Sequence, residues 1–106
     1  MFDQITIIGC GLIGSSIFKA LKKKSSIKKI ITFDNNKSAM EVIKKDNLSD
    51  KIVSSSAEAV KNSDLVLIST PSSSFTSVIG EIKESLKSGS ILTDTLSVKK
   101  GFEVKL

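Results

Sequence analysis

The sequence predicts an α/β protein built on a doubly wound parallel sheet. Short runs of β-branched residues alternate with amphipathic helical patterns along the 106 residues. Three glycines, at positions 9, 11 and 14, stand where the first of these runs gives way to the first helical pattern. Strand, helix and strand in strict alternation imply right-handed crossovers and a parallel sheet. At this length we expect one domain with a modest core.

The first half of the chain shows three strand patterns and two helical ones. The run QITIIG is β-branched and ends in glycine, as buried strands often do. Ile13, Ile17 and Leu21 then recur at every fourth position, which indicates an amphipathic helix. The patterns predict strands over 4–9, 28–34 and 50–55, a helix from residue 12 onward, and a helix over 37–45 with Met40, Val42 and Ile43 facing inward.

The second half continues the alternation. Ser56 is the expected N-cap of a short helix over 56–63. The run DLVLIST, over 64–70, is the most hydrophobic strand and is stopped by Pro71. A long helical face follows at Phe75, Val78, Ile79, Ile82 and Leu86, and then a strand over 90–94. We expect five parallel strands in the order 3-2-1-4-5, with helices on both faces.

Composition narrows the class of protein. The net charge of +5 comes from 16 lysines, and the chain has no arginine, tyrosine or tryptophan. Because arginine forks and aromatic rings are the usual tools for reading nucleic acids, we expect no nucleic-acid partner. No apolar run approaches the roughly 20 residues of a membrane span, and the N-terminus MFDQ lacks a basic signal region. We therefore expect no membrane association and a cytoplasmic protein without a metal site.

The glycines fit the pattern G-x-G-x-x-G and suggest a nucleotide site. Gly9 permits a tight turn, Gly11 lets the backbone approach a pyrophosphate, and Gly14 lets the helix pack closely on the sheet. Free N–H groups at the start of the helix, around Leu12 and Ile13, would hold the phosphates. The alternative is a tight strand–helix turn without a ligand.

Asp34 lies 20 residues past Gly14, at the end of the second predicted strand. Its carboxylate can accept hydrogen bonds from both hydroxyls of the adenosine ribose. A carboxylate there repels a 2′-phosphate, and the chain has no arginine to bind one. We therefore expect NAD as the cofactor, with NADP disfavoured. Lys37 offers partial compensation for NADP, although an exposed helix lysine is the simpler interpretation.

A second cluster of polar residues follows the fourth and fifth predicted strands. Ser69, Thr70 and Pro71 end one of them, and Asp94 ends the other. In doubly wound sheets, ligands bind beyond the carboxyl ends of the strands, which is where a nicotinamide ring would lie. Ser97 follows in the next loop, together with a lysine. Ser97 is a candidate active-site hydroxyl or simply the cap of a further helix.

The segments GCGLIGSSIFKAL, DLVLISTP and TDTLSVK together resemble the prephenate and arogenate dehydrogenases of tyrosine biosynthesis. The likeness extends over essentially the whole chain. It implies that the matching glycines and Asp34 bind NAD, and that Ser97 helps position a catalytic histidine and the ring hydroxyl of the substrate. The implied reaction is oxidative decarboxylation: a histidine takes the proton of the 4-hydroxyl, hydride leaves C4 for the nicotinamide, and loss of carbon dioxide aromatises the ring.

The chain departs from that family pattern in two respects. Leu96 stands where the family often has glycine, and there is no histidine in the sequence. The resemblance therefore implies a dinucleotide-binding domain over 1–106 that is incomplete at its C-terminus. It would stop before the sixth strand and the helical domain that supplies the substrate-binding arginines and the dimer interface. We expect this chain alone to be inactive, and a homodimer only for a full-length parent.

Two other functions stay open at this point. One is another NAD(P)-dependent dehydrogenase, of the β-hydroxyacid or pyrroline-carboxylate reductase type, which shares the glycine loop. The other is a non-catalytic module that senses NAD. The T-D-x-x-S-V-K segment disfavours the first, and an active-site-like loop after the last predicted strand disfavours the second.

Overall fold

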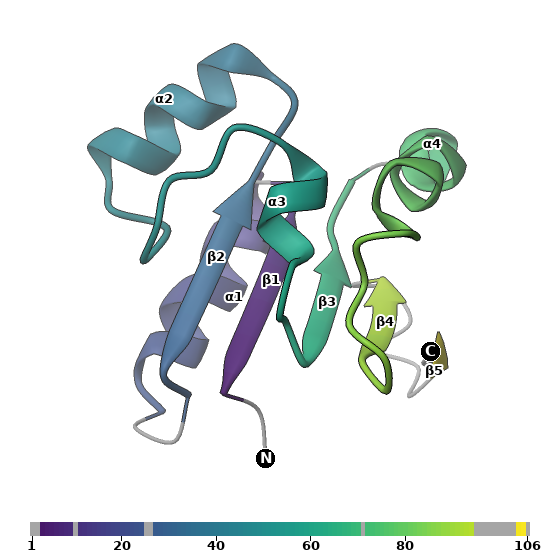
Figure 1. Ribbon diagram of the computed structural model, residues 1–106. Coiled ribbons are helices and arrows are strands. Elements are labelled where there is room, and N and C mark those ends of the chain that lie inside the picture. Colours follow the sequence, from purple (N-terminus) through teal and green to yellow (C-terminus); the bar gives the residue numbers. More distant parts are fainter. Residues whose placement is uncertain (1–2, 10, 25–26, 71, 95–103, 106) are drawn as a thin grey trace.

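A computed structural model describes residues 3–9, 11–24, 27–70, 72–94 and 104–105. Its centre is a five-stranded sheet with the order β2-β1-β3-β4-β5 (Figure 1). The first four strands pair in parallel, and the short last strand runs antiparallel to β4. The parallel α/β class is therefore confirmed. The strands are β1 Gln4–Ile8, β2 Lys29–Phe33, β3 Leu65–Ile68, β4 Ile91–Asp94 and β5 Val104–Lys105.

Helices cover both faces of the sheet, as the doubly wound class requires. In Figure 1, α1 lies behind the sheet and α3 in front of it. One core cluster joins Phe18 of α1 and Ile43 of α2 to the sheet, and a second joins Val60 of α3 and Ile82 of α4 to the other face. The helices are α1 Leu12–Lys22, α2 Lys37–Lys45, α3 Ser56–Val60 and α4 Ser72–Ile82. None of the helices in these described ranges is long and apolar enough to cross a membrane.

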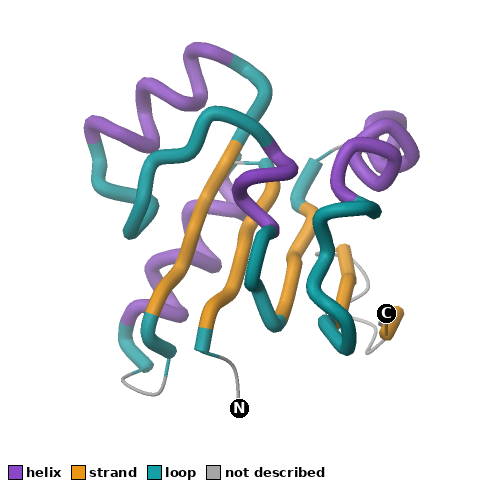
Figure 2. The backbone as a smooth tube through the Cα atoms, viewed as in Figure 1, coloured by secondary structure: helices purple, strands orange, loops and turns teal. Residues whose placement is uncertain are grey.

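The predicted strand over 50–55 is wrong, because that segment is a loop (Figure 2). It runs along the outer edge of β2 but satisfies that edge mainly with side chains. Asp50 accepts a hydrogen bond from the N–H of Ile30 through Oδ2 (2.8 Å), and Ser49 accepts one from Thr32 through Oγ (2.9 Å). Side-chain acceptors replace the regular backbone ladder there, so β2 is the edge strand. The expected order 3-2-1-4-5 therefore loses its third strand. The observed sheet has four parallel strands, β2-β1-β3-β4, and the antiparallel β5 at the other edge.

Several element boundaries also differ from expectation. The N-cap of α3 is Ser55, whose hydroxyl accepts a hydrogen bond from the N–H of Glu58, and the helix ends at Val60. Ser56 instead donates to Glu81 of α4 (2.8 Å) and ties the two helices together. In α2 the expected inward position of Val42 is wrong, since its side chain is 46% exposed. The predicted helical face after Pro71 reaches the core through Val78 and Ile82, and Leu86 packs on it beyond the end of α4. The side chain of Phe75, which was predicted for the same face, lies outside the described part.

Candidate nucleotide-binding site

The turn between β1 and α1 is built from backbone that only glycine accommodates. Gly9 adopts φ +99°, and its N–H donates to the carbonyl of Phe33 in β2 (2.7 Å). A Cβ on Gly9 would lie 2.9 Å from Cγ2 of Thr70 and 3.0 Å from the backbone of Ser69. The left-handed backbone and the crowding from the β3 loop both exclude a side chain.

Gly14 is required for a different reason. A Cβ at this position would lie 2.4 Å from the carbonyl oxygen of Gly9. The first turn of α1 therefore packs directly on the turn that precedes it, and a backbone atom would have to move to admit even a methyl group.

Gly11 faces open space. A Cβ there would meet no atom within 4 Å among the described residues, and its backbone is extended, so the fold itself does not demand glycine. Gly11 is the N-cap of α1, but no side chain caps the helix and its first turn holds no acidic residue. The start of α1 thus presents backbone N–H groups and the positive end of a helix dipole beside an open surface, which is favourable for an anion.

Ser69 and Thr70 border this turn from the neighbouring strand. The N–H of Ser69 donates to the carbonyl of Ile8 (2.7 Å), which holds the β3 loop against the end of β1. The Oγ1 of Thr70 is buried and has no hydrogen-bond partner among the described residues. The hydroxyls of Thr32 and Ser90 are also buried without a partner in the described part, so it is the position of Thr70 beside the glycine turn that makes its hydroxyl a candidate for bonding to a ligand.

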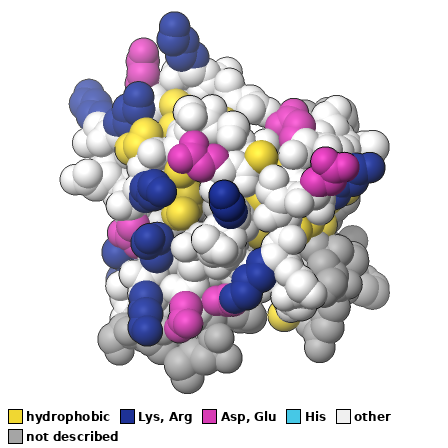
Figure 3. Space-filling model, viewed as in Figure 1, with side chains coloured by type: hydrophobic (Ala, Val, Ile, Leu, Met, Phe, Trp, Pro, Cys, Tyr) yellow, Lys and Arg dark blue, Asp and Glu magenta, His cyan; other side chains and the backbone are white. Residues whose placement is uncertain are grey.

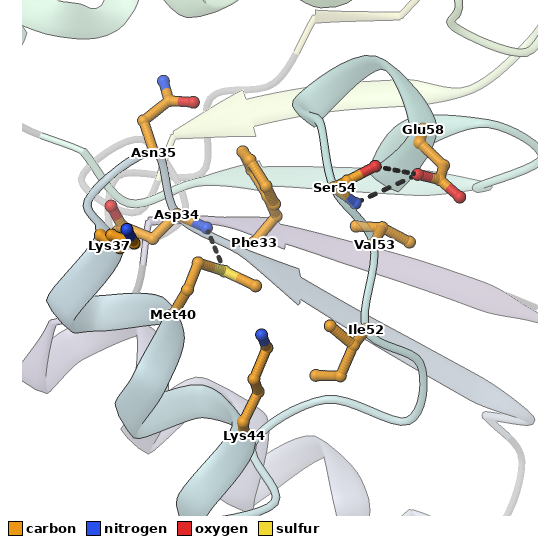
Figure 4. Close-up of a pocket in the computed structure, with 10 residues that line it drawn as sticks. All are labelled: Phe33, Asp34, Asn35, Lys37, Met40, Lys44, Ile52, Val53, Ser54 and Glu58. Carbon is orange, nitrogen blue, oxygen red and sulfur yellow. Dashed lines mark hydrogen bonds between the residues drawn. The ribbon is translucent and has the colours of Figure 1, made fainter.

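Asp34 lies beside a pocket of about 530 Å³ at the carboxyl end of β2 (Figure 4). Its Oδ1 accepts a hydrogen bond from the N–H of Asn36 (2.8 Å), and its own N–H donates to Sδ of Met40 (3.3 Å). These bonds fix the turn into α2. Phe33, Met40 and Ile52 give the pocket apolar walls, with Lys37 and Lys44 on the α2 side.

Glu58 contributes a second carboxylate to the rim of the same pocket. Its Oε1 accepts hydrogen bonds from the N–H and the hydroxyl of Ser54, both at 3.1 Å. The bond from the Ser54 backbone, followed by the one from its hydroxyl, holds the pKa of Glu58 below its usual value. Glu58 is therefore charged at neutral pH and committed to the loop before α3.

The structure brings Gly9, Gly14, Ser69 and Thr70 together at the carboxyl edge of the sheet, as sequence reasoning expected. Asp94 ends β4 opposite Ile68, but its side chain, like those of Leu12 and Ile13, lies outside the described part. Pro71 and Ser97 also lie outside the described residues.

Sequence reasoning missed the far side of the pocket. Lys44 lies seven residues after Lys37 and four after Met40, so helical spacing in α2 places all three on one face. That signal was present in the sequence. The sequence does not indicate Ile52 and Ser54, because their segment has the pattern of a strand and reaches the pocket as a loop.

Comparison with known proteins identifies the family. Residues 17–105 match the family described as the nucleotide-binding domain of prephenate dehydrogenase. The chain belongs to this family. The match begins after the glycine loop, so the geometry of that loop is independent support for a nucleotide site. A curated relative, the cyclohexadienyl dehydrogenase of Zymomonas mobilis, is 33% identical over 99 residues, which cover 93% of this chain and 34% of the relative.

Solved structures agree in fold. A prephenate dehydrogenase from Aquifex aeolicus, crystallised with hydroxyphenyl propionate and NAD⁺, superposes with a TM-score of 0.77 at 23% identity, covering 89% of this chain and 33% of that one. The 3-hydroxyisobutyrate dehydrogenase of Mycobacterium tuberculosis also gives 0.77, at 18% identity, covering 90% and 32%. The chain spans about a third of the length of these relatives. At such identities the superpositions establish the fold alone.

Proposed function

We propose that this chain is the NAD-binding portion of an oxidoreductase that acts on prephenate or arogenate by oxidative decarboxylation. One observation carries the proposal: in a chain of the prephenate dehydrogenase family, a glycine turn opens α1 and Asp34 stands at the end of the adjacent strand. This is the arrangement that holds a pyrophosphate and an adenosine ribose in dinucleotide-binding domains.

The residues present fit a dinucleotide. The open space at Gly11 leaves room for the pyrophosphate next to the uncapped start of α1. The hydroxyl of Thr70 lacks a protein partner among the described residues and can bond to the ligand. Asp34 borders a pocket large enough for an adenosine. When bound, NAD supplies the acceptor for the hydride, and a related enzyme of the same fold was crystallised with NAD⁺.

The remaining chemistry falls to groups that position the substrate and move its proton. Ser97 is proposed to face the nicotinamide end of the site and to orient the substrate hydroxyl, and Asp94 and Pro71 to border that end. The chain has no histidine, so the base that removes the hydroxyl proton belongs to residues outside these 106. General-base catalysis is typically worth about 10²–10⁴-fold in rate, so this chain alone should bind the cofactor without measurable turnover.

Fold does not separate this proposal from a β-hydroxyacid dehydrogenase, since both kinds of structure superpose equally well. The sequence relationship to a cyclohexadienyl dehydrogenase, together with the family match, favours prephenate or arogenate. The proposal includes a dinucleotide-binding domain over residues 1–106, a further helical domain and a homodimer in a full-length parent, and a cytoplasmic location.

Calorimetry with NAD and NADP on the 106-residue chain tests the cofactor. The reaction is tested in the full-length protein encoded by the reading frame that contains this chain, by measuring NADH formation from prephenate and from arogenate. Absence of NAD binding by the chain would overturn the proposal.

In that longer protein, Ser97→Ala should lower kcat by more than it changes the Kd for NAD, because the hydroxyl acts on the substrate. An unchanged kcat would reduce Ser97 to a helix cap.

A further inference from the structure

The pocket beside Asp34 carries two lysines from one helix. Lys37 opens α2 and Lys44 lies two turns later on the same face, with Met40 between them. Figure 4 shows Lys44 pointing from α2 into the pocket, toward Met40 and Ile52. The long side chain thus lies along apolar surface while its ammonium group remains available to a ligand.

The acidic groups of the pocket accept hydrogen bonds from the protein, whereas its lysines form no ion pair with a described residue. Asp34 accepts a hydrogen bond from Asn36, and Glu58 accepts two from Ser54. Elsewhere in the described chain, Lys22 and Lys87 pair with carboxylates. Within the described ranges, Lys37 and Lys44 form no such pair, a state that they share with most lysines, and they differ from the others by lining this pocket. Each carboxylate keeps further acceptor sites, so Asp34 can still bind ribose hydroxyls, while the two lysines add cationic donors on the α2 side of the pocket.

A position near the end of a helix gives Lys44 a purely structural alternative. Cations in the last turn interact favourably with the helix dipole, and Lys44 and Lys45 both lie there. Both lysines are exposed, but only Lys44 lines the pocket. The two neighbours share the dipole contribution but differ in access to a ligand, and this makes Lys45 a matched control.

We propose that Lys44, assisted by Lys37, binds a phosphate on the 2′ position of the adenosine ribose, so that the site accepts NADP as well as NAD. The inference rests on the proposed function, in that the pocket holds the adenosine half of a dinucleotide. Asp34 then sets the preference for NAD by repulsion, and Lys44 limits how large that preference becomes. The balance between one carboxylate and two ammonium groups decides the cofactor.

Calorimetry on the 106-residue chain tests the assignment with five proteins: the parent, Lys44→Gln, Lys45→Gln, Asp34→Asn, and Asp34→Asn combined with Lys44→Gln. A charge-assisted hydrogen bond to phosphate predicts that Lys44→Gln weakens NADP binding about tenfold and NAD binding less than twofold. Lys45→Gln should leave both unchanged. The loss should persist in the Asp34→Asn background, relative to Asp34→Asn alone. Equal effects of Lys44→Gln on the two cofactors, or no effect on NADP, would overturn the assignment.

Adenosine 2′,5′-bisphosphate and ADP separate this inference from the proposed function, because neither contains nicotinamide. The bisphosphate should bind the parent about tenfold more tightly than it binds Lys44→Gln, while ADP binds both alike. The difference should shrink at high salt, since it depends on charge. If NAD fails to bind but the bisphosphate still distinguishes the two proteins, the dehydrogenase proposal fails and the phosphate site stands. If the bisphosphate binds both proteins equally, Lys44 has no such role.

Discussion

The two ends of the sheet are built in opposite ways. At the amino end, carboxylates join the strands together: Asp64 accepts hydrogen bonds from the N–H groups of Asp3 and Gln4 and pairs with Lys87. Asp50 likewise accepts from Ile30 and pairs with Lys22. At the carboxyl end the connections include the glycine turn at Gly9 and short polar loops, and two donors, the Thr70 hydroxyl and the Lys44 ammonium, have no partner among the described residues.

The difference separates stability from binding. Asp64 and Asp50 at the amino end accept hydrogen bonds from strand N–H groups and pair with lysines, which stabilises the fold. At the carboxyl end, Thr70 and Lys44 have no partner among the described residues, and Gly11 faces open space. On the face shown in Figure 3, lysines and acidic side chains are interspersed. Because the amino end serves stability and the carboxyl end binding, substitutions at the amino end should change the free energy of unfolding, and substitutions at the carboxyl end should change the affinity for NAD.

Gly14→Ala should break this separation and have the largest effect. The new Cβ would overlap the carbonyl of Gly9, so the turn and α1 must move apart. Overpacking against backbone predicts a loss of about 3 kcal/mol in the free energy of unfolding, together with loss of NAD binding. Urea denaturation and calorimetry measure the two effects. An alanine variant of normal stability would mean that the helix does not pack as tightly as the structure indicates.

Gly11→Ala should weaken NAD binding while leaving the stability of the fold almost unchanged. The methyl group meets no described atom, so the free energy of unfolding should change by less than about 1 kcal/mol, the scale of an altered N-cap. If the pyrophosphate contacts this backbone, the same methyl group should weaken NAD binding about thirtyfold, or ~2 kcal/mol. The same two measurements apply. Unchanged NAD affinity would place the phosphates elsewhere.

Backbone-built features were the most predictable from the sequence. Gly9 combines a φ of +99° with crowding from Thr70, and Gly14 lies against the carbonyl of Gly9, so both positions require glycine. The spacing of these glycines therefore predicted the turn, and Asp34 follows at the end of the neighbouring strand. Side-chain solutions were not predictable in the same way. Nothing in the pattern of residues 50–55 distinguishes a strand from a loop that satisfies an edge strand through Ser49 and Asp50.

The pocket was only half predicted for the same reason. Asp34 is predictable because an acidic residue is expected about 20 residues after the glycine motif. Ile52 and Ser54 reach the pocket only because of the path that their loop takes. Val42 shows the limit of the apolar pattern in a short helix. Ile43 is fully buried, whereas the side chain of Val42, the residue before it, is exposed to solvent.

Asp34→Ala should change cofactor preference more than stability. Removing the carboxylate removes acceptors for the ribose hydroxyls, which predicts about a tenfold loss of NAD affinity. It also removes repulsion of a 2′-phosphate, so the gap between NAD and NADP should narrow. The hydrogen bond to Asn36 is exposed, and the cost in unfolding free energy should stay below about 1 kcal/mol. An Asp34→Ala variant with the same ratio of NAD to NADP affinity as the parent would contradict the role given to Asp34.

Asp64→Asn should have the smallest effect, and it should appear in stability alone. The hydrogen bond from Lys87, followed by those from Asp3 and Gln4, lowers the pKa of Asp64 to about 2 from an ordinary 3.8. Because the folded pKa is depressed, the stabilisation is present above pH 4 and is lost as the pH falls toward 2. The carboxylate is 21% exposed, so screening reduces the contribution to about 1 kcal/mol at neutral pH. Urea denaturation from pH 7 to pH 2 should therefore show the parent and Asp64→Asn converging in acid, with NAD affinity at pH 7 unchanged.

Glu41→Gln is the matched control: it removes the same charge from an exposed position of α2, where no described residue pairs with it, and should leave stability unaltered. A constant difference between the parent and Asp64→Asn at every pH would show that the loss comes from packing or a neutral hydrogen bond. In that case the charge would not be what joins the strands at the amino end.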